Sequence, residues 1–293
     1  MEQHDADVDK LAALDARRKA GGSVGALAAV PVSAWFGGRQ SARSLHFIAA
    51  AGFALFIGLV VTLGAWEWAR LAGFEAQSMR VGYAVVVAAM LFVMHLEQGL
   101  APWVLGAAVL WWGVATFLVL TFPRTSEHWS SAACKLVIGL LILLPAWQGL
   151  VMIKQYPLGN WLIMAVMVLV WGADIGAYFS GRAFGKRKLA PMVSPGKSWE
   201  GVYGGLALSL VITLIVGLVR DWSLADALKG LIGAAIIVFI SVVGDLTESM
   251  FKRQAGIKDS SNLLPGHGGV LDRIDSLTAA IPVFAVLLWM AAP

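Results

Sequence analysis

Apolar residues gather along most of the chain in long runs that short polar segments interrupt. A transmembrane helix needs about 20 mostly apolar residues, because each residue advances the helix by about 1.5 Å across a hydrocarbon layer about 30 Å thick. One run is short, glycine-rich and interrupted by Pro31. The runs cover residues 22–36, 46–66, 81–94, 100–122, 135–153, 158–179, 202–218, 228–243 and 277–291. The pattern predicts an all-α, polytopic transmembrane helical bundle of about nine spans, or eight if residues 22–36 do not span.

The composition agrees with a membrane protein. Of the 293 residues, 59% are hydrophobic, whereas a soluble domain is closer to half apolar or less. The net charge of +4 does not indicate nucleic-acid binding, because the basic residues lie between the apolar runs, where they orient a membrane protein. We expect a polar N-terminal tail at residues 1–21 and a single integral-membrane catalytic domain at residues 22–293.

The distribution of basic residues predicts the orientation in the membrane. Residues 181–200 and 249–275 are rich in lysine and arginine and are separated by two spans, so both should face the cytoplasm. The same count places residues 67–80 and 123–135 inside. Residues 95–99, which contain neither lysine nor arginine, then lie outside. Charged side chains therefore collect on the cytoplasmic side.

Two candidate polar sites precede the last apolar runs. Asp174 lies near the inner end of the run 158–179, where a carboxylate is costly and by default marks a site or path; an interfacial cap or a lysine partner is the alternative. Gly196-Lys197-Ser198 resembles the end of a nucleotide P-loop. However, Pro191 stands where that motif needs glycine, and no strand is predicted before it.

The stretch around Lys197 remains a candidate phosphate cradle at the start of a helix. A helix N-terminus offers free N–H groups and partial positive charge to an anion. We expect Ser194 or Ser198 to cap this helix, with Glu200 in its first turn. The alternative is a cap with ordinary cytoplasmic charges.

Carboxylates recur three residues apart at the ends of two apolar runs. Asp245 and Glu248 follow the run 228–243, and Asp272 and Asp275 precede the last run. Residues at this spacing share a helix face, so the two pairs can form an oxygen-rich Mg²⁺ site. Cationic side chains between them suit phosphate oxygens: Lys252, Arg253, Lys258 and Arg273. A solvated cytoplasmic loop is the alternative interpretation of either group alone.

The motifs narrow the chemistry to phosphoryl or nucleotidyl transfer. His267 lies among three glycines that let the backbone approach a ligand. The chain has no His-Glu-x-x-His, Cys-x-x-Cys or Gly-x-Ser-x-Gly motif, so zinc hydrolysis and serine-triad chemistry lack support. Residues 66–70, Trp-Glu-Trp-Ala-Arg, are predicted to be a membrane-interface anchor rather than a catalytic group.

Residues 249–275 resemble the signature of bacterial phosphatidate cytidylyltransferases, also called CDP-diacylglycerol synthases. The pattern is Ser-x-apolar-Lys-Arg, four residues, Lys-Asp, a spacer, and Pro-x-His-Gly-Gly-apolar-x-Asp-Arg-apolar-Asp, and every position is filled. Upstream, Trp-Gly-Ala-Asp174, Phe-Gly-Lys186 and Ser194-Pro-Gly-Lys-Ser198 look like a second region of the same family. The resemblance covers about residues 45–293, whereas residues 1–44 differ from the family's usual start.

The resemblance implies that CTP and phosphatidic acid give CDP-diacylglycerol and pyrophosphate. It implies Mg²⁺, alone or with a second cation, held by Asp245 and Asp272 with Asp275 nearby. We expect catalytic roles for Asp245, Asp272 and Lys252. Substrate-binding residues are expected to be Asp174, Ser194, Lys197, Ser198, Ser249, Arg253, Lys258, His267 and Arg273.

The expected setting is a bacterial inner membrane, with the protein crossing several times as a monomer or homodimer and its site facing the cytoplasm. A transporter of an anionic metabolite is one alternative, although charges confined to one side disfavour a path through the membrane. A lipid kinase with a similar site is the other.

Overall fold

The structure is a computed structural model that describes residues 39–291. The chain divides into two compact units, Met1–Ala49 and Ala50–Pro293. The expected tail at residues 1–21 and the expected span at residues 22–36 lie outside the described residues. Everything below concerns the second unit, which contains every candidate site residue.

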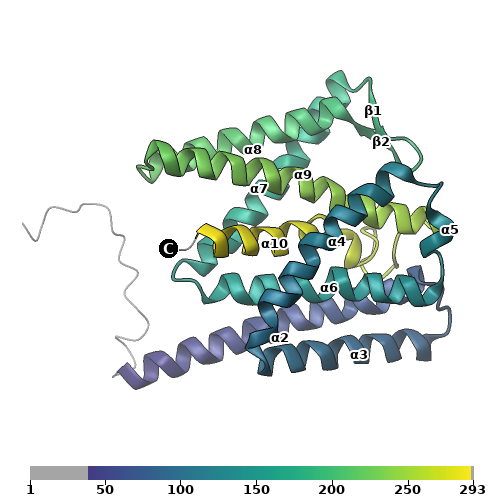
Figure 1. The fold of residues 1–293 in the computed structure, drawn as a ribbon, viewed down its shortest axis with the longest axis horizontal. Helices are drawn as coiled ribbons and strands as arrows, with labels where there is room; N and C mark the ends of the chain where they lie inside the picture. The colour runs from purple at the N-terminus through teal and green to yellow at the C-terminus, as the bar shows by residue number, and fades with distance from the viewer. Residues whose placement is uncertain (1–38, 292–293) are drawn as a thin grey trace, which may run out of the picture. The chain divides into compact units, whose positions relative to one another are not determined.

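Helices make up nearly all of the described chain (Figure 1). The elements are α2 (Arg39–Leu71), α3 (Gln77–Leu96), the 3₁₀ helix η2 (Gln98–Leu100), α4 (Ala101–Thr121), α5 (Ser126–Trp129), α6 (Ala132–Gln155), α7 (Gly159–Phe184), β1 (Lys188–Ala190), β2 (Ser194–Ser198), α8 (Trp199–Val219), α9 (Leu224–Gln254) and α10 (Leu271–Ala291). Within residues 39–291, eight helices are long and apolar enough to cross a membrane. The prediction of an all-α polytopic protein is confirmed.

Helix α6 is the central helix of the second unit. In its most apolar window 67% of residues are buried, against at most 39% in any other candidate span. Leu143 on α6 is fully buried in one apolar cluster with Trp68 and Trp112, and Ile153 near its end joins a second cluster. The outer faces of the other helices carry exposed apolar side chains such as Leu110 and Leu218, as lipid contact requires.

Helices α7 and α8 approach each other closely through glycines. A Cβ atom built on Gly176 would lie 2.6 Å from the carbonyl oxygen of Gly204, so no side chain fits between these backbones. Small residues allow such contact in membrane helices, where dispersion rather than water exclusion drives packing. The pair positions Asp174 on α7 beside the start of α8.

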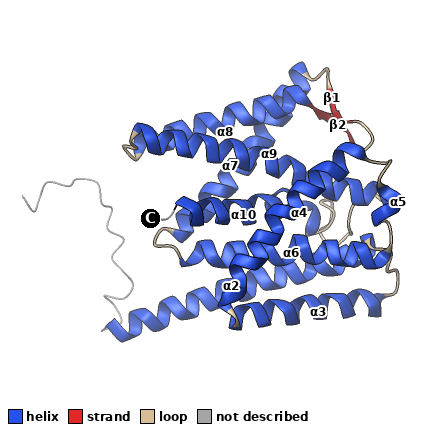
Figure 2. Ribbon diagram, in the orientation of Figure 1, coloured by secondary structure: helices blue, strands red, loops and turns tan. Residues whose placement is uncertain are grey.

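A short β-hairpin connects α7 to α8, where the sequence predicted no strand (Figure 2). β1 and β2 are antiparallel, with Lys188 opposite Ser198. Ser198 then caps α8, because its hydroxyl accepts a hydrogen bond from the Gly201 amide at 3.2 Å. Glu200 follows in the first turn, where it accepts bonds from the Lys186 and Arg187 amides. The expected cap at Ser198 is confirmed, and it lies at the end of a strand.

Candidate active site

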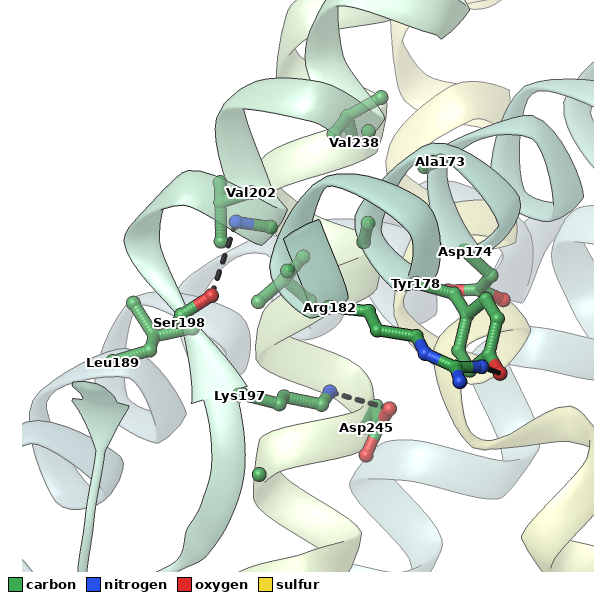
Figure 3. Close-up of a pocket in the computed structure, with 16 residues that line it drawn as sticks. Ala173, Asp174, Tyr178, Arg182, Leu189, Lys197, Ser198, Val202, Val238 and Asp245 are labelled. Atoms are coloured by element: carbon green, nitrogen blue, oxygen red, sulfur yellow. Dashed lines mark hydrogen bonds and ion pairs between the residues drawn. The ribbon is translucent and has the colours of Figure 1, made fainter. Parts of the chain in front are cut away.

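A cavity of about 600 Å³ opens between α7, α8, α9 and the hairpin (Figure 3). Its polar lining comes from three of the sequence regions singled out above, which are far apart in the chain. The polar lining residues are Asp174, Tyr178, Arg182, Lys197, Ser198 and Asp245. The hairpin lies at the same end of the second unit as α5 and the link between α9 and α10 (Figure 1).

Lys197 and Asp245 point toward each other inside this cavity (Figure 3). The Lys197 ammonium group forms an ion pair with the Asp245 carboxylate, which joins β2 to α9. Each side chain is 29% exposed, so an incoming ligand has access to both. Ser249, one turn further along α9, donates a hydrogen bond to the other oxygen of Asp245 at 3.3 Å.

Asp174 lies on the α7 side of the cavity. Its neighbour Tyr178, one turn later, accepts a hydrogen bond from Arg182 at 3.1 Å, so α7 presents an acid, a phenol and a cation in succession. Figure 3 shows Asp174 on the same side as Tyr178, with Asp245 across from it. Asp174 therefore lines the cavity, but it is exposed rather than enclosed within the bundle.

A second charged group lies where α9 ends and α10 begins, outside the cavity lining. Lys252 donates to Asp272 Oδ1 at 2.7 Å and lies 3.4 Å from Glu248 Oε1, so one ammonium group serves two carboxylates. Asp272 Oδ2 accepts bonds from the Gly269 amide at 2.7 Å and from the Ser260 amide and hydroxyl at 3.0 and 2.9 Å. The Asp272 side chain is only 8% exposed.

Asp275 connects the two charged groups. A Cβ atom on Gly244 would lie 2.7 Å from the Asp275 carbonyl oxygen, so α9 and α10 touch beside Asp245. The Asp275 carboxyl group is within electrostatic range of Asp245 and of Glu248. The four carboxylates predicted from their spacing thus lie along the contact between α9 and α10. They are Asp245 and Glu248 on α9 and Asp272 and Asp275 on α10.

These carboxylates suit Mg²⁺ by their chemistry, since the ion prefers oxygen ligands from aspartate and water. In the described part of the chain, no three carboxylate, histidine or cysteine side chains already converge on a common metal position. Instead, each of the two carboxylates predicted to hold the metal is paired with a lysine, Asp245 with Lys197 and Asp272 with Lys252. A bound cation would have to replace these ammonium groups.

The remaining candidate residues are away from the cavity lining, and several support loops. Arg253 donates to the Val193 carbonyl oxygen at 3.2 Å and so ties α9 to the hairpin that contains Ser194. Arg273 donates to the His267 carbonyl oxygen at 3.0 and 2.6 Å, and both side chains are exposed. Lys258 is also exposed.

Sequence reasoning misjudged Glu67. It is fully buried and accepts bonds from the Ser261 hydroxyl at 2.6 Å and from the Val270 and Leu271 amides at 2.9 and 2.6 Å. The prediction of a membrane-interface anchor was therefore wrong for this residue and for buried Trp68. The sequence feature that could have identified Glu67 as a functional residue is a carboxylate within an apolar run, the feature that also singled out Asp174.

Comparison with known proteins decides the family. Residues 32–291 match the model of the cytidylyltransferase family. The chain belongs to this family. The match covers both charged groups and all eight candidate spans described above.

Several curated relatives of this chain share one name. A phosphatidate cytidylyltransferase from Pseudomonas aeruginosa is 66% identical over 241 residues, which are 82% of this chain and 89% of that relative. The Haemophilus influenzae protein of the same name is 44% identical, covering 80% and 88%. That of Brucella suis is 36% identical, covering 84% and 86%. The resemblance inferred from residues 249–275 is confirmed, and the chain is a multi-pass membrane protein.

Proposed function

We propose that this chain transfers the cytidylyl group of CTP to phosphatidic acid, giving CDP-diacylglycerol and pyrophosphate. The observation that carries the proposal is the 66% identity with a phosphatidate cytidylyltransferase over nearly the full length of that relative. The structure supports it with a cavity of about 600 Å³ where a lysine and two carboxylates meet at one end of a helical bundle.

In the reaction, a phosphate oxygen of phosphatidate attacks the α-phosphorus of CTP. The bond between the α-phosphorus and the bridging oxygen of the β-phosphate breaks, and pyrophosphate leaves with that oxygen. Catalysis of this kind depends on positioning and charge neutralisation. Lys197 and Lys252, which pair with Asp245 and Asp272 in the structure, would release these carboxylates and neutralise phosphate oxygens. No covalent intermediate with the protein is needed.

Asp245 and Asp272, with Asp275, would hold Mg²⁺, alone or with a second cation. When bound, the metal would supply positive charge that offsets the charge developing on the reacting phosphate oxygens. Asp174 and Ser198 line the cavity and Ser249 bonds to Asp245 at its wall, and all three would contact substrate. Ser194, Arg253, Lys258, His267 and Arg273 are expected to bind substrate or to hold the loops that do.

The site is proposed to face the cytoplasm across a bacterial inner membrane. The ends of the bundle near the cavity carry the basic residues, as the positive-inside rule requires. The acyl chains of phosphatidate stay in the bilayer, and the headgroup enters between helices. The protein acts as a monomer or a homodimer, which light scattering of the purified protein distinguishes.

The test is an assay of the purified protein in detergent with CTP, phosphatidic acid and Mg²⁺. We expect CDP-diacylglycerol and pyrophosphate as products. Asp272→Asn should lower kcat/KM by roughly 10²-fold or more, because a preorganised charge at the reacting phosphates is lost. Asp221→Asn is the matched control, since Asp221 is exposed in the turn between α8 and α9 at the opposite helix ends.

Different outcomes separate the alternatives. Full activity of Asp272→Asn contradicts the metal assignment but not the reaction. Phosphorylated lipid together with a nucleoside diphosphate indicates a lipid kinase. Flux of an anionic metabolite into liposomes without CTP indicates a transporter.

A further inference from the structure

Glu67 on α2 reaches the link between α9 and α10, about 200 residues away in the chain. Its two oxygens accept bonds from the Val270 amide at 2.9 Å, the Leu271 amide at 2.6 Å and the Ser261 hydroxyl at 2.6 Å. The Ser260 hydroxyl lies 3.3 Å away. The side chain is completely buried. One carboxylate thus contacts both ends of the loop that carries the glycine-rich turn.

A buried carboxylate needs strong compensation, and hydrogen-bond donors provide it here. Among residues 49–291, whose side chains the structure describes, no lysine, arginine or histidine lies within ion-pair distance of Glu67. Charge-assisted bonds from N–H and O–H groups are about twice as strong as neutral ones. Two of the donors are amides at the start of α10, where the helix dipole also favours negative charge. Glu67 therefore caps α10 from a different helix.

Ser260 in this loop lies between Glu67 and Asp272 and contacts both carboxylates. The Ser260 hydroxyl lies 2.9 Å from Asp272 Oδ2 and 3.3 Å from Glu67 Oε2, and it has a single proton to donate. Any Cβ atom on Gly269 would collide with the Ser260 hydroxyl and the Glu67 carboxyl group. Arg70, one turn after Glu67, donates to the Ser260 carbonyl oxygen at 3.2 Å. Helix α2 therefore fixes the segment that presents Asp272.

We propose that Glu67 is a positioning residue for the reaction: it fixes residues 260–271 and thereby the direction in which Asp272 faces the substrate phosphates. This inference rests on the proposed function, in which Asp272 holds the metal. Partners behind metal ligands orient those ligands, and losing one costs about 10–100-fold in metal affinity or activity. Glu67 occupies that position through the Ser260 hydroxyl and the Gly269–Leu271 backbone.

The first test is Glu67→Gln. An amide keeps the shape but places an NH₂ group against amide and hydroxyl donors, so part of the network is lost. We expect kcat to fall roughly 10–100-fold. The Mg²⁺ concentration that gives half-maximal activity, called here the Mg²⁺ constant, should rise by a similar factor. The KM for phosphatidate should be unchanged. Glu75→Gln is the matched control, because Glu75 is exposed between α2 and α3.

Hydrogen–deuterium exchange gives a readout that requires no turnover. In Glu67→Gln, the Val270 and Leu271 amides should exchange faster, while amides in the middle of α6 stay protected. Equal loss of protection in all helices, with an unchanged Mg²⁺ constant, would show that Glu67 is only a structural support. The proposal would also be overturned if Glu67→Gln showed the same kinetics and the same amide exchange as the wild type.

Ser261→Ala covers the case in which Glu67→Gln does not fold. This variant removes one donor to Glu67 and leaves the Glu67 side chain itself unchanged. We expect a smaller rise in the Mg²⁺ constant and faster amide exchange at Val270. The absence of both effects overturns the proposal.

If the wild type makes no CDP-diacylglycerol, the proposed function fails. Amide exchange at residues 260–271 still shows whether Glu67 orders the loop.

Discussion

At the residue scale, the site consists of lysine–carboxylate pairs joining different elements. Lys197 on β2 meets Asp245 on α9, and Lys252 on α9 meets Asp272 on α10. In a partly dry environment, each ammonium group stabilises a carboxylate that would otherwise be costly. In the proposed reaction, the phosphate oxygens of CTP would compete for the same lysines. Each lysine thus offsets only part of the negative charge around it, because Asp174 and Glu248 lie in the same two groups.

Lys197→Met should lower kcat/KM for CTP by roughly 10²–10³-fold, because a fixed positive charge near the reacting phosphates is lost. Methionine retains much of the aliphatic volume, so the hairpin should remain folded. The measurement is steady-state kinetics with CTP varied at saturating phosphatidate. Lys229→Met is the matched control, since the Lys229 side chain is 74% exposed near the opposite end of α9. Equal kinetics of the two variants would exclude Lys197 from phosphate binding.

At the element scale, the position of the cavity depends on how closely α7 and α8 pack. Gly176 faces the Gly204 carbonyl oxygen, and a Cβ on Gly205 would lie 2.5 Å from the Ala173 carbonyl oxygen. Backbone contact of this kind holds Asp174 near β2 and α9 without intervening side chains.

The polar last turns of α9 extend beyond the predicted run 228–243, and α10 begins before the predicted residue 277.

Gly176→Ala should destabilise the protein by about 1–3 kcal/mol, because the added methyl group overlaps the α8 backbone. Alanine is otherwise the better helix former, so any loss of stability must come from packing. Thermal unfolding in detergent measures the effect. Gly113→Ala on α4 is the control, since nothing lies within 4 Å of its added Cβ. Identical melting temperatures would contradict the close approach.

At the scale of the whole molecule, charged residues gather at one end of the described bundle. The hairpin, α5 and the α9–α10 link share this end (Figure 1), whereas the other helix ends carry fewer cations. Basic loops stay in the cytoplasm during membrane insertion. The cavity and both lysine–carboxylate pairs are therefore expected to face CTP in the cytoplasm.

Labelling of single cysteines tests this orientation. In a Cys134→Ser background, Glu97→Cys should react with a membrane-impermeant maleimide in intact spheroplasts. Met192→Cys, which replaces a side chain that is 63% exposed in the hairpin, should react only after the membrane is disrupted. The physical reason is that the hairpin lies among lysines and arginines and residue 97 does not. The reverse labelling pattern would place the cavity outside.

The sequence alone determined the helices and much of the site. Spans are encoded locally, because a bilayer forces each apolar run to satisfy its own backbone hydrogen bonds. The spacing of Asp245, Glu248, Asp272 and Asp275 showed which acids share a helix face. The pattern of residues 249–275 indicated the family before any geometry was known.

Only the tertiary structure decided which charges meet. The pairing of Lys197 with Asp245 depends on a hairpin between α7 and α8, and hydrophobic periodicity does not report a strand that short. Glu67 looked like an interfacial residue because its partners lie about 200 residues later in the chain. Periodicity encodes which face of a helix is buried, whereas the identity of the buried partner depends on how distant helices pack.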